Sequence, residues 1–213
     1  MLSSKVLEML DAGKIDELRK MLQDEIYIES LNKKPGSKKR YAAMKRYFGY
    51  HKPAREILQK PCEIEFEGTK YISFCNTWSL AMTTEDCGEI ELVEDVDRYP
   101  DVTRLLRFDG IKKKIDFRKV IAEATAKGYK LTNGEIGSKF RYLMHYDGTY
   151  YKLGLIDATY RIIDNGVPPI TYHPDGIRMP LTIKNDIGLC MVMPVFIKDT
   201  DIVEDTHIVI EVE

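Results

Sequence analysis

Basic side chains are concentrated between Lys33 and Lys60, where ten lysines and arginines accompany a single acid, Glu56. Residues 1–60 contain 14 basic and 8 acidic side chains and residues 61–213 contain 18 and 26, although the whole chain carries a net charge of only −2. Like charges this close repel one another unless a polyanion, an acidic partner or solvent offsets them. We expect the cluster to bind nucleic acid, with DNA ahead of RNA, or a protein that itself binds nucleic acid. The candidate residues are Lys33, Lys34, Lys38, Lys39, Arg40, Lys45, Arg46, Lys52 and Arg55.

Aromatic residues lie among these cations, at Tyr41, Tyr47, Phe48 and Tyr50. Aromatic faces next to guanidinium and ammonium groups are typical of surfaces that bind single strands or phosphates. The alternative is a solvated basic face that docks on the acidic body of the same chain. Because no base-reading motif accompanies the charge, both interpretations stay open.

Sequence signatures of catalysis are absent: the chain has no P-loop, dinucleotide fingerprint, zinc-protease helix motif or nucleophile elbow. Acid pairs such as Glu94 with Asp95, or Asp199 with Asp201, could bind a divalent ion. A two-metal site, however, needs carboxylates that converge from strand ends, which sequence alone does not show. We therefore expect a protein that is not an enzyme and that uses no metal or cofactor.

The four cysteines, Cys62, Cys75, Cys87 and Cys190, are isolated and form no C-x-x-C motif. Zinc binding by the first three with a histidine would need ligands from separate strands, whereas structural zinc sites usually show closely paired ligands. Reduced thiols are expected instead. The chain also has no signal peptide and no stretch of roughly 20 apolar residues, which predicts a cytoplasmic protein that makes no use of a membrane.

Three helices are expected in the first 60 residues, because apolar residues recur there at helical spacing. The first would be capped by Ser3 or Ser4 and end at Gly13, and the third would be capped by Ser37 and end at Gly49. On the third helix, Tyr41, Met44 and Phe48 form an apolar stripe that is expected to face the core. The expected helical ranges are 3–13, 14–31, 37–49 and a last turn over 53–59.

From Cys62 onward the apolar period changes to two, which is typical of strands. Glu67-Gly68 and Asp147-Gly148 supply the chemistry of tight hairpin turns. Helices are predicted from Asp116 and from Asp157. The predicted strands cover 62–66, 69–75, 89–93, 139–146, 149–156, 179–183, 189–197 and 207–212. The sequence therefore predicts an α+β fold, with a basic helical region over 1–60 and a β-rich body of antiparallel strands with two inserted helices over 61–213.

Several motifs in the second half occur in an order and spacing that resemble one domain of bacterial DNA polymerase sliding clamps. Residues 98–106, RYPDVTRLL, resemble the junction before a clamp domain, and DFRKVIAEA is similar to that domain's first helix. YYKLGLIDATYRIID resembles the strand and helix of that domain's second half, and MPLTI with LCMVMPV resembles its closing hairpin. The resemblance covers about residues 90–197, with 98–197 as the best-matched unit, 61–97 as a candidate partial repeat and 198–213 as an acidic terminal strand.

This resemblance implies antiparallel sheets backed by two helices that can touch DNA. It also implies a hydrophobic cleft for a partner protein, and Met191, Met193 and Pro194 match the family stretch that lines it. Our leading hypothesis is a non-enzymatic, clamp-like accessory factor of a phage or other mobile element. Such a factor would bind nucleic acid through 33–55 and a host replication or defence protein through the β-rich body.

Two alternatives stay open at this point. The first is a phage-encoded anti-defence inhibitor, for example an anti-CRISPR protein, whose acidic body mimics DNA while the basic helix grips a host nuclease. The second is a metal-dependent nuclease, because acidic residues are plentiful.

Overall fold

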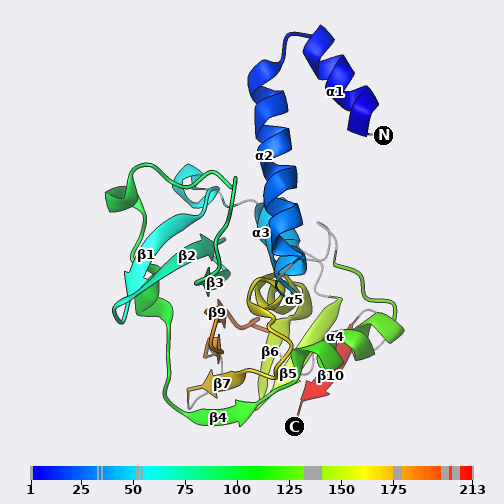
Figure 1. Ribbon diagram of the computed structural model, residues 1–213. Helices are drawn as coiled ribbons and strands as arrows, with labels where there is room; N and C mark the ends of the chain where they lie inside the picture. The colour runs from blue at the N-terminus through cyan, green and yellow to red at the C-terminus, as the bar shows by residue number, and fades with distance from the viewer. Residues whose placement is uncertain are drawn as a thin grey trace.

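Two β-sheets pack against one central helix, α5 (Leu153–Ile163), in the computed structural model (Figure 1). The fold is α+β, as predicted from the sequence. The structure describes residues 2–32, 34, 36–50, 53, 55–131, 141–174, 179–197, 202 and 207–212.

The helices largely follow the apolar periodicity, with differences at their starts. The other helices are α1 (Leu2–Asp11), α2 (Ile15–Leu31), α3 (Ser37–Tyr50) and α4 (Phe117–Ala126), with short 3-10 turns at Glu56–Leu58, Val96–Arg98 and Val102–Leu105. Asp116 caps α4 through its carboxylate, as predicted, and Gly128 has a φ of 92° just after the helix. Ser3 and Ser4 lie inside α1, which begins at Leu2 and not after either serine.

Helix α5 begins four residues before the predicted start at Asp157, and the strand predicted to run through Ile156 stops at Lys152. Residues 153–156 are apolar throughout and are all buried. In a short run of apolar residues, the spacing of the side chains does not distinguish a strand from a buried helix. Only the surrounding packing could therefore decide its conformation.

Seven strands form the larger sheet, in which every neighbouring pair is antiparallel. In spatial order they are β1 (Cys62–Phe66), β2 (Thr69–Cys75), β3 (Ser79–Thr83), β9 (Gly188–Val192), β8 (Leu181–Lys184), β7 (Ile170–His173) and β4 (Ile111–Lys114). The smaller sheet has the order β10 (Ile208–Val212), β5 (Tyr142–Tyr146) and β6 (Thr149–Lys152). β10 pairs with β5 in parallel, whereas the other paired strands, including β5 with β6, are antiparallel.

Both predicted hairpins are confirmed. Glu67 and Gly68 have φ angles of 51° and 74°, and Asp147 and Gly148 have φ angles of 48° and 70°. Two consecutive residues with positive φ are typical of the type I′ turn, whose twist matches that of the flanking strands. The turns thus set the β1–β2 and β5–β6 registers.

The predicted strand over 89–93 is not formed. Ile90 and Leu92 pack on one hydrophobic core and Val93 lies in the other. The Val93 amide donates to the Pro61 carbonyl at 2.8 Å, but the segment joins no ladder. The apolar residues there anchor an extended connection. Conversely, β3, β4 and β7 were not predicted. The residues of β3 and β4, SLAMT and IKKK, lack a clear alternation of apolar and polar side chains, and β7 has only four residues.

Two hydrophobic cores lie on the two faces of the larger sheet. The inner core surrounds α5 and includes Cys190 and Val192 of β9, whereas the second core includes Leu189 and Met191 of the same strand. This alternation follows from the two-residue period of a strand. Val192 and Met191 therefore face opposite sides of the sheet.

Helix α3 belongs to the same hydrophobic core as the sheets. Met44 and Tyr47 are buried in the inner core with Phe74 of β2 and Ile163 of α5. The Tyr47 hydroxyl also donates to the Ser79 carbonyl of β3 at 3.1 Å. Helix α3 therefore packs directly on strands and a helix that follow residue 60 in the chain.

Replacing Gly148 with alanine should lower the free energy of unfolding by about 1–2 kcal/mol, because an L-residue at its positive φ is strained. A Cβ at this position would meet no atom within 4 Å, so the cost comes from the backbone alone. Gly49→Ala is the matched control, since it also meets open space but lies in α3. It should stabilise the protein by roughly 0.5–1 kcal/mol. Urea unfolding measures both values, and equal effects would contradict the turn assignment.

Candidate nucleic-acid interface

The apolar stripe of α3 fixes how the helix is oriented on the body. Tyr41 and Met44 are buried and Phe48 is partly buried against the inner core, so the prediction that these residues face the core is confirmed. Because this side of α3 is covered, the cations must leave the helix on its other sides.

Those cations separate onto two sides of the helix. Lys39 and Arg46, seven residues apart, line a groove toward α4 and α5. Lys45 lies on the α2 side, where its ammonium group forms an ion pair with the Asp24 carboxylate. The Tyr41 hydroxyl also donates to Asp24. Partial burial is the largest single influence on the pKa of this carboxyl and raises it. The hydrogen bonds from Lys45 and Tyr41, with the charge of Lys45, outweigh burial and hold the pKa below its usual value. Lys45 thus helps to attach α2 to α3.

The groove between α3, α4 and α5 collects positive charge from all three helices. It has a volume of about 800 Å³. Arg118 of α4 and Arg161 of α5 join Lys39 and Arg46, and Tyr50 and Tyr160 line it beside them. Its acidic lining residues are Asp157 and Asp164. The lining therefore carries an excess of positive charge.

Asp157 is occupied by other side chains and does not offer a free carboxylate. It is fully buried, and the Arg161 guanidinium binds it with two donors, at 2.5 and 2.9 Å. The Tyr129 hydroxyl donates to the same carboxylate at 3.0 Å. Such a fork-to-fork pair fixes the guanidinium plane, and it raises the pKa of Arg161, so this cation stays charged. The side chain of Arg161 is half-exposed and reaches the groove from this fixed base.

Tyr160 is held as a hydrogen-bond donor at the base of the groove. Its burial, together with the nearby Asp164 carboxylate, raises the pKa of its phenol well above the usual value. The hydroxyl therefore stays protonated and donates to Asp164 at 3.1 Å. This contact keeps the second acid of the groove turned toward the protein.

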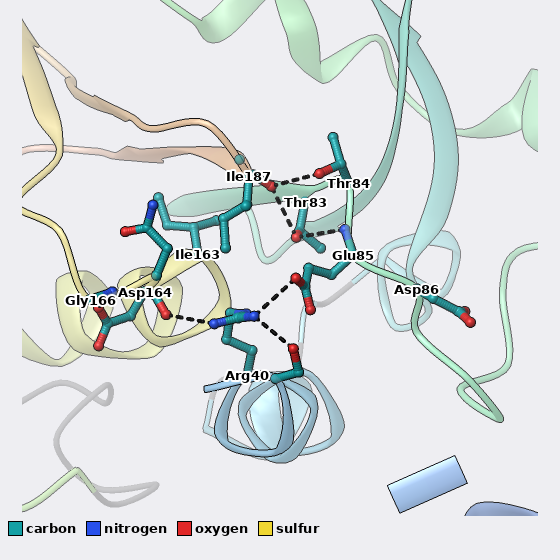
Figure 2. A network of polar contacts seen from close by, with 12 residues as sticks. Arg40, Thr83, Thr84, Glu85, Asp86, Ile163, Asp164, Gly166 and Ile187 are labelled. Atoms are coloured by element: carbon teal, nitrogen blue, oxygen red, sulfur yellow. Dashed lines mark hydrogen bonds and ion pairs between the residues drawn. The ribbon is translucent and has the colours of Figure 1, made fainter. Parts of the chain in front are cut away.

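The structure corrects the prediction that Arg40 binds a ligand. Its side chain is only 5% exposed and contacts other residues of this chain. Its guanidinium donates to the Ser37 hydroxyl at 2.8 Å, to the Glu85 carboxylate at 2.9 Å and to the Asp164 carbonyl at 3.0 Å. Figure 2 shows it pointing from α3 toward both acidic residues. A buried guanidinium needs such partners, and here they tie α3 to the end of α5 and to the segment after β3.

The remaining predicted cations lie outside the groove or outside the described residues. Lys34, Lys38 and Arg55 are exposed but do not line the groove. Lys33 and Lys52 lie outside the described residues. Of the nine predicted residues, the structure therefore brings together Lys39 and Arg46, with Arg40 buried behind them.

Sequence reasoning missed Arg118 and Arg161, which lie far from the basic cluster along the chain. The four-residue spacing between Asp157 and Arg161 was a usable signal, because such pairs meet on a helix. Nothing in the sequence, however, showed that α4 and α5 lie beside α3.

The predicted protein-binding residues are mostly in the core. Met191 is buried in the second core and Pro194 is buried as well, so neither lines an open cleft, which corrects that prediction. Met193 is partly buried against the same core. Its amide donates to the carbonyl of Trp78 at 2.9 Å, and the Trp78 side chain is half-exposed. The surface at this place is thus formed by Trp78 and Met193.

The acidic pairs do not assemble into a metal site within the part of the chain that the structure describes. No three side chains among its described histidines, cysteines, aspartates and glutamates lie close enough to hold an ion. Asp199 and Asp201 lie outside that part.

Comparisons with known proteins give no relative for this chain. No protein-family model, curated protein or solved structure matches it. The resemblance to a sliding-clamp domain therefore stays a prediction. Among the described helices, none is both long and apolar enough to cross a membrane.

Replacing Arg40 with methionine should lower the free energy of unfolding by about 3 kcal/mol, because it leaves Glu85 without its cation in a largely buried place. Lys39→Met, one residue away and exposed, should change it by no more than about 0.5 kcal/mol. Urea unfolding of both variants measures the difference. Similar losses in the two would show that Arg40 has no special structural role.

The cysteines should be protected from alkylation in the folded protein. All four are free and buried, and burial raises the pKa of each thiol. A thiol with a raised pKa stays protonated at pH 8 and is a poor nucleophile. Iodoacetamide at that pH should therefore modify all four only after denaturant is added, as mass spectrometry can count. Rapid modification of the native protein would contradict this burial.

Proposed function

We propose that this protein is a non-enzymatic nucleic-acid-binding protein whose contact site is the groove between α3, α4 and α5. The observation that carries the proposal is the convergence of Lys39, Arg46, Arg118 and Arg161 from three separate helices on one hollow. Asp157 pairs with Arg161 and Asp116 pairs with Arg118, which offsets part of this charge. A bound polyanion would relieve the repulsion that remains among the cations.

The chemistry of the groove supports phosphate binding over general acid–base catalysis. Its buried acid, Asp157, is held by Arg161 and Tyr129, and Asp164 accepts from Tyr160. These carboxylates thus accept hydrogen bonds from cations and hydroxyls of the protein itself. Arginine and lysine side chains are the usual partners of phosphate oxygens in nucleic-acid complexes.

Tyr50 provides a partly exposed ring beside the cations. Aromatic rings in basic grooves stack with unpaired bases whatever their identity. The proposed site therefore contacts the backbone and stacks with a base, and we expect it to bind DNA in preference to RNA with little dependence on base sequence.

Fluorescence anisotropy with labelled single-stranded DNA, duplex DNA and single-stranded RNA of the same sequence tests the proposal. If four cations contact phosphates, the logarithm of the binding constant should fall with the logarithm of salt concentration with a slope of roughly −3 to −4. Lys39→Gln should make the slope shallower by about one, because it removes one phosphate contact. Arg46→Gln should act in the same way.

Lys38→Gln is the matched control, because Lys38 is the neighbouring exposed lysine on the same helix but does not line the groove. It should leave both the affinity and the slope nearly unchanged. Equal losses of affinity for Lys38→Gln and Lys39→Gln would show that the basic surface binds as a whole, without a specific role for the groove. Failure to bind any of the three probes at about 50 mM salt would contradict the proposal as a whole.

A further inference from the structure

The outward side of α2 presents an apolar stripe that no described residue covers. Ile15, Leu22 and Ile26 expose 51%, 39% and 68% of their surfaces. Residues seven and eleven positions apart lie on nearly the same side of a helix. Leu7 and Leu10 of α1 are also largely exposed. Large aliphatic side chains gathered on one helical arm indicate an interaction surface.

The stripe lies on the side of α2 that faces away from the body. Asp24 accepts hydrogen bonds from Tyr41 and Lys45, and the Tyr27 hydroxyl donates to the Asp86 carbonyl at 2.8 Å. These contacts hold the C-terminal half of α2, whereas its N-terminal half and α1 extend beyond the sheets (Figure 1). Ile26 remains exposed although its neighbour Tyr27 is attached. The outward side of α2 is therefore open at Ile15, Leu22 and Ile26, although Leu18 between them is buried.

Two charged residues, Arg19 and Glu29, continue the same side of the helix. Both are exposed, and neither forms an ion pair with a described residue. Their opposite charges lie at opposite ends of the apolar stretch formed by Leu22 and Ile26. Such a stripe has the charge pattern needed to pair with a reversed copy of itself.

We propose that a second copy of this chain covers the stripe, with the two α2 helices antiparallel across a two-fold axis. The pair Leu22 and Ile26 and the pair Arg19 and Glu29 are both centred on residue 24. One antiparallel alignment therefore places Leu22 against the partner's Ile26 and Arg19 opposite the partner's Glu29, and the symmetry repeats both contacts. A parallel alignment would instead place like charges together at both positions.

Sedimentation velocity on the full chain tests this at about 100 μM protein, where a homodimer of micromolar affinity is almost fully formed. The wild-type protein should have twice the 24.6 kDa chain mass. Ile26→Glu should give monomers, since it puts two charges into the contact, and Leu22→Gln should weaken the dimer at least tenfold. Val167→Glu is the matched control, because Val167 is comparably exposed but lies far from the arm in sequence, after α5. It should leave the mass unchanged.

Charge reversal tests the alignment. Arg19→Glu and Glu29→Arg should each weaken the dimer, and the chain that carries both changes should recover it, because opposite charges then face each other again. Circular dichroism should show the same thermal midpoint for all monomeric variants, since every altered residue is exposed. A wild-type monomer, a dimer that survives Ile26→Glu, or a double reversal that does not recover would each overturn the proposal.

Discussion

Burial of α5 on all sides is the constraint on which the rest of the structure depends. Ten of its eleven residues are buried. A helix that is apolar around its whole circumference must be covered around its whole circumference. The larger sheet, the smaller sheet, α3 and α4 supply that cover. Arg161 is the α5 residue that is not buried, and it lies where α5 lines the groove.

Two charged side chains inside this arrangement, Asp157 and Arg40, are paired with groups of opposite charge. A buried carboxylate is costly unless it is hydrogen-bonded and paired with a cation, and Asp157 has both Tyr129 and Arg161. At the end of the helix, carbonyl groups lack helical partners and carry partial negative charge. Arg40 donates to the Asp164 carbonyl there and thereby seats α3 on α5. The contacts that stabilise the core therefore also position the lining of the groove.

The same helix α3 thus contributes to the core, to the attachment of α2 and to the groove. Its apolar side enters the inner core, Lys45 contacts α2, and Lys39 and Arg46 face the groove. If two copies pair through α2, the assembly carries two basic grooves. A polyanion long enough to reach both would then bind with an effective concentration that one groove alone cannot provide.

Much of the local structure could be predicted from the sequence, because its causes are local. The apolar period determined α2, α3 and α4, and the turn residues Glu67-Gly68 and Asp147-Gly148 determined two hairpins. The basic cluster also identified Lys39 and Arg46 as candidates for the site.

Tertiary structure alone decided what depends on neighbours distant in sequence. Residues 153–156 are helical in an environment where apolar surfaces surround them. β10 pairs with β5 in parallel, and the apolar period of a strand does not indicate which strand it will pair with. Burial likewise decided that Arg40 binds Glu85 and Asp164, and packing of α4 and α5 beside α3 brought Arg118 and Arg161 to Lys39 and Arg46. The sequence by itself thus determined most of the helices, two hairpins and the segment of the chain in which the positive charge is concentrated. The fold decided which of those charges reach one groove, because that depends on contacts between segments more than 60 residues apart.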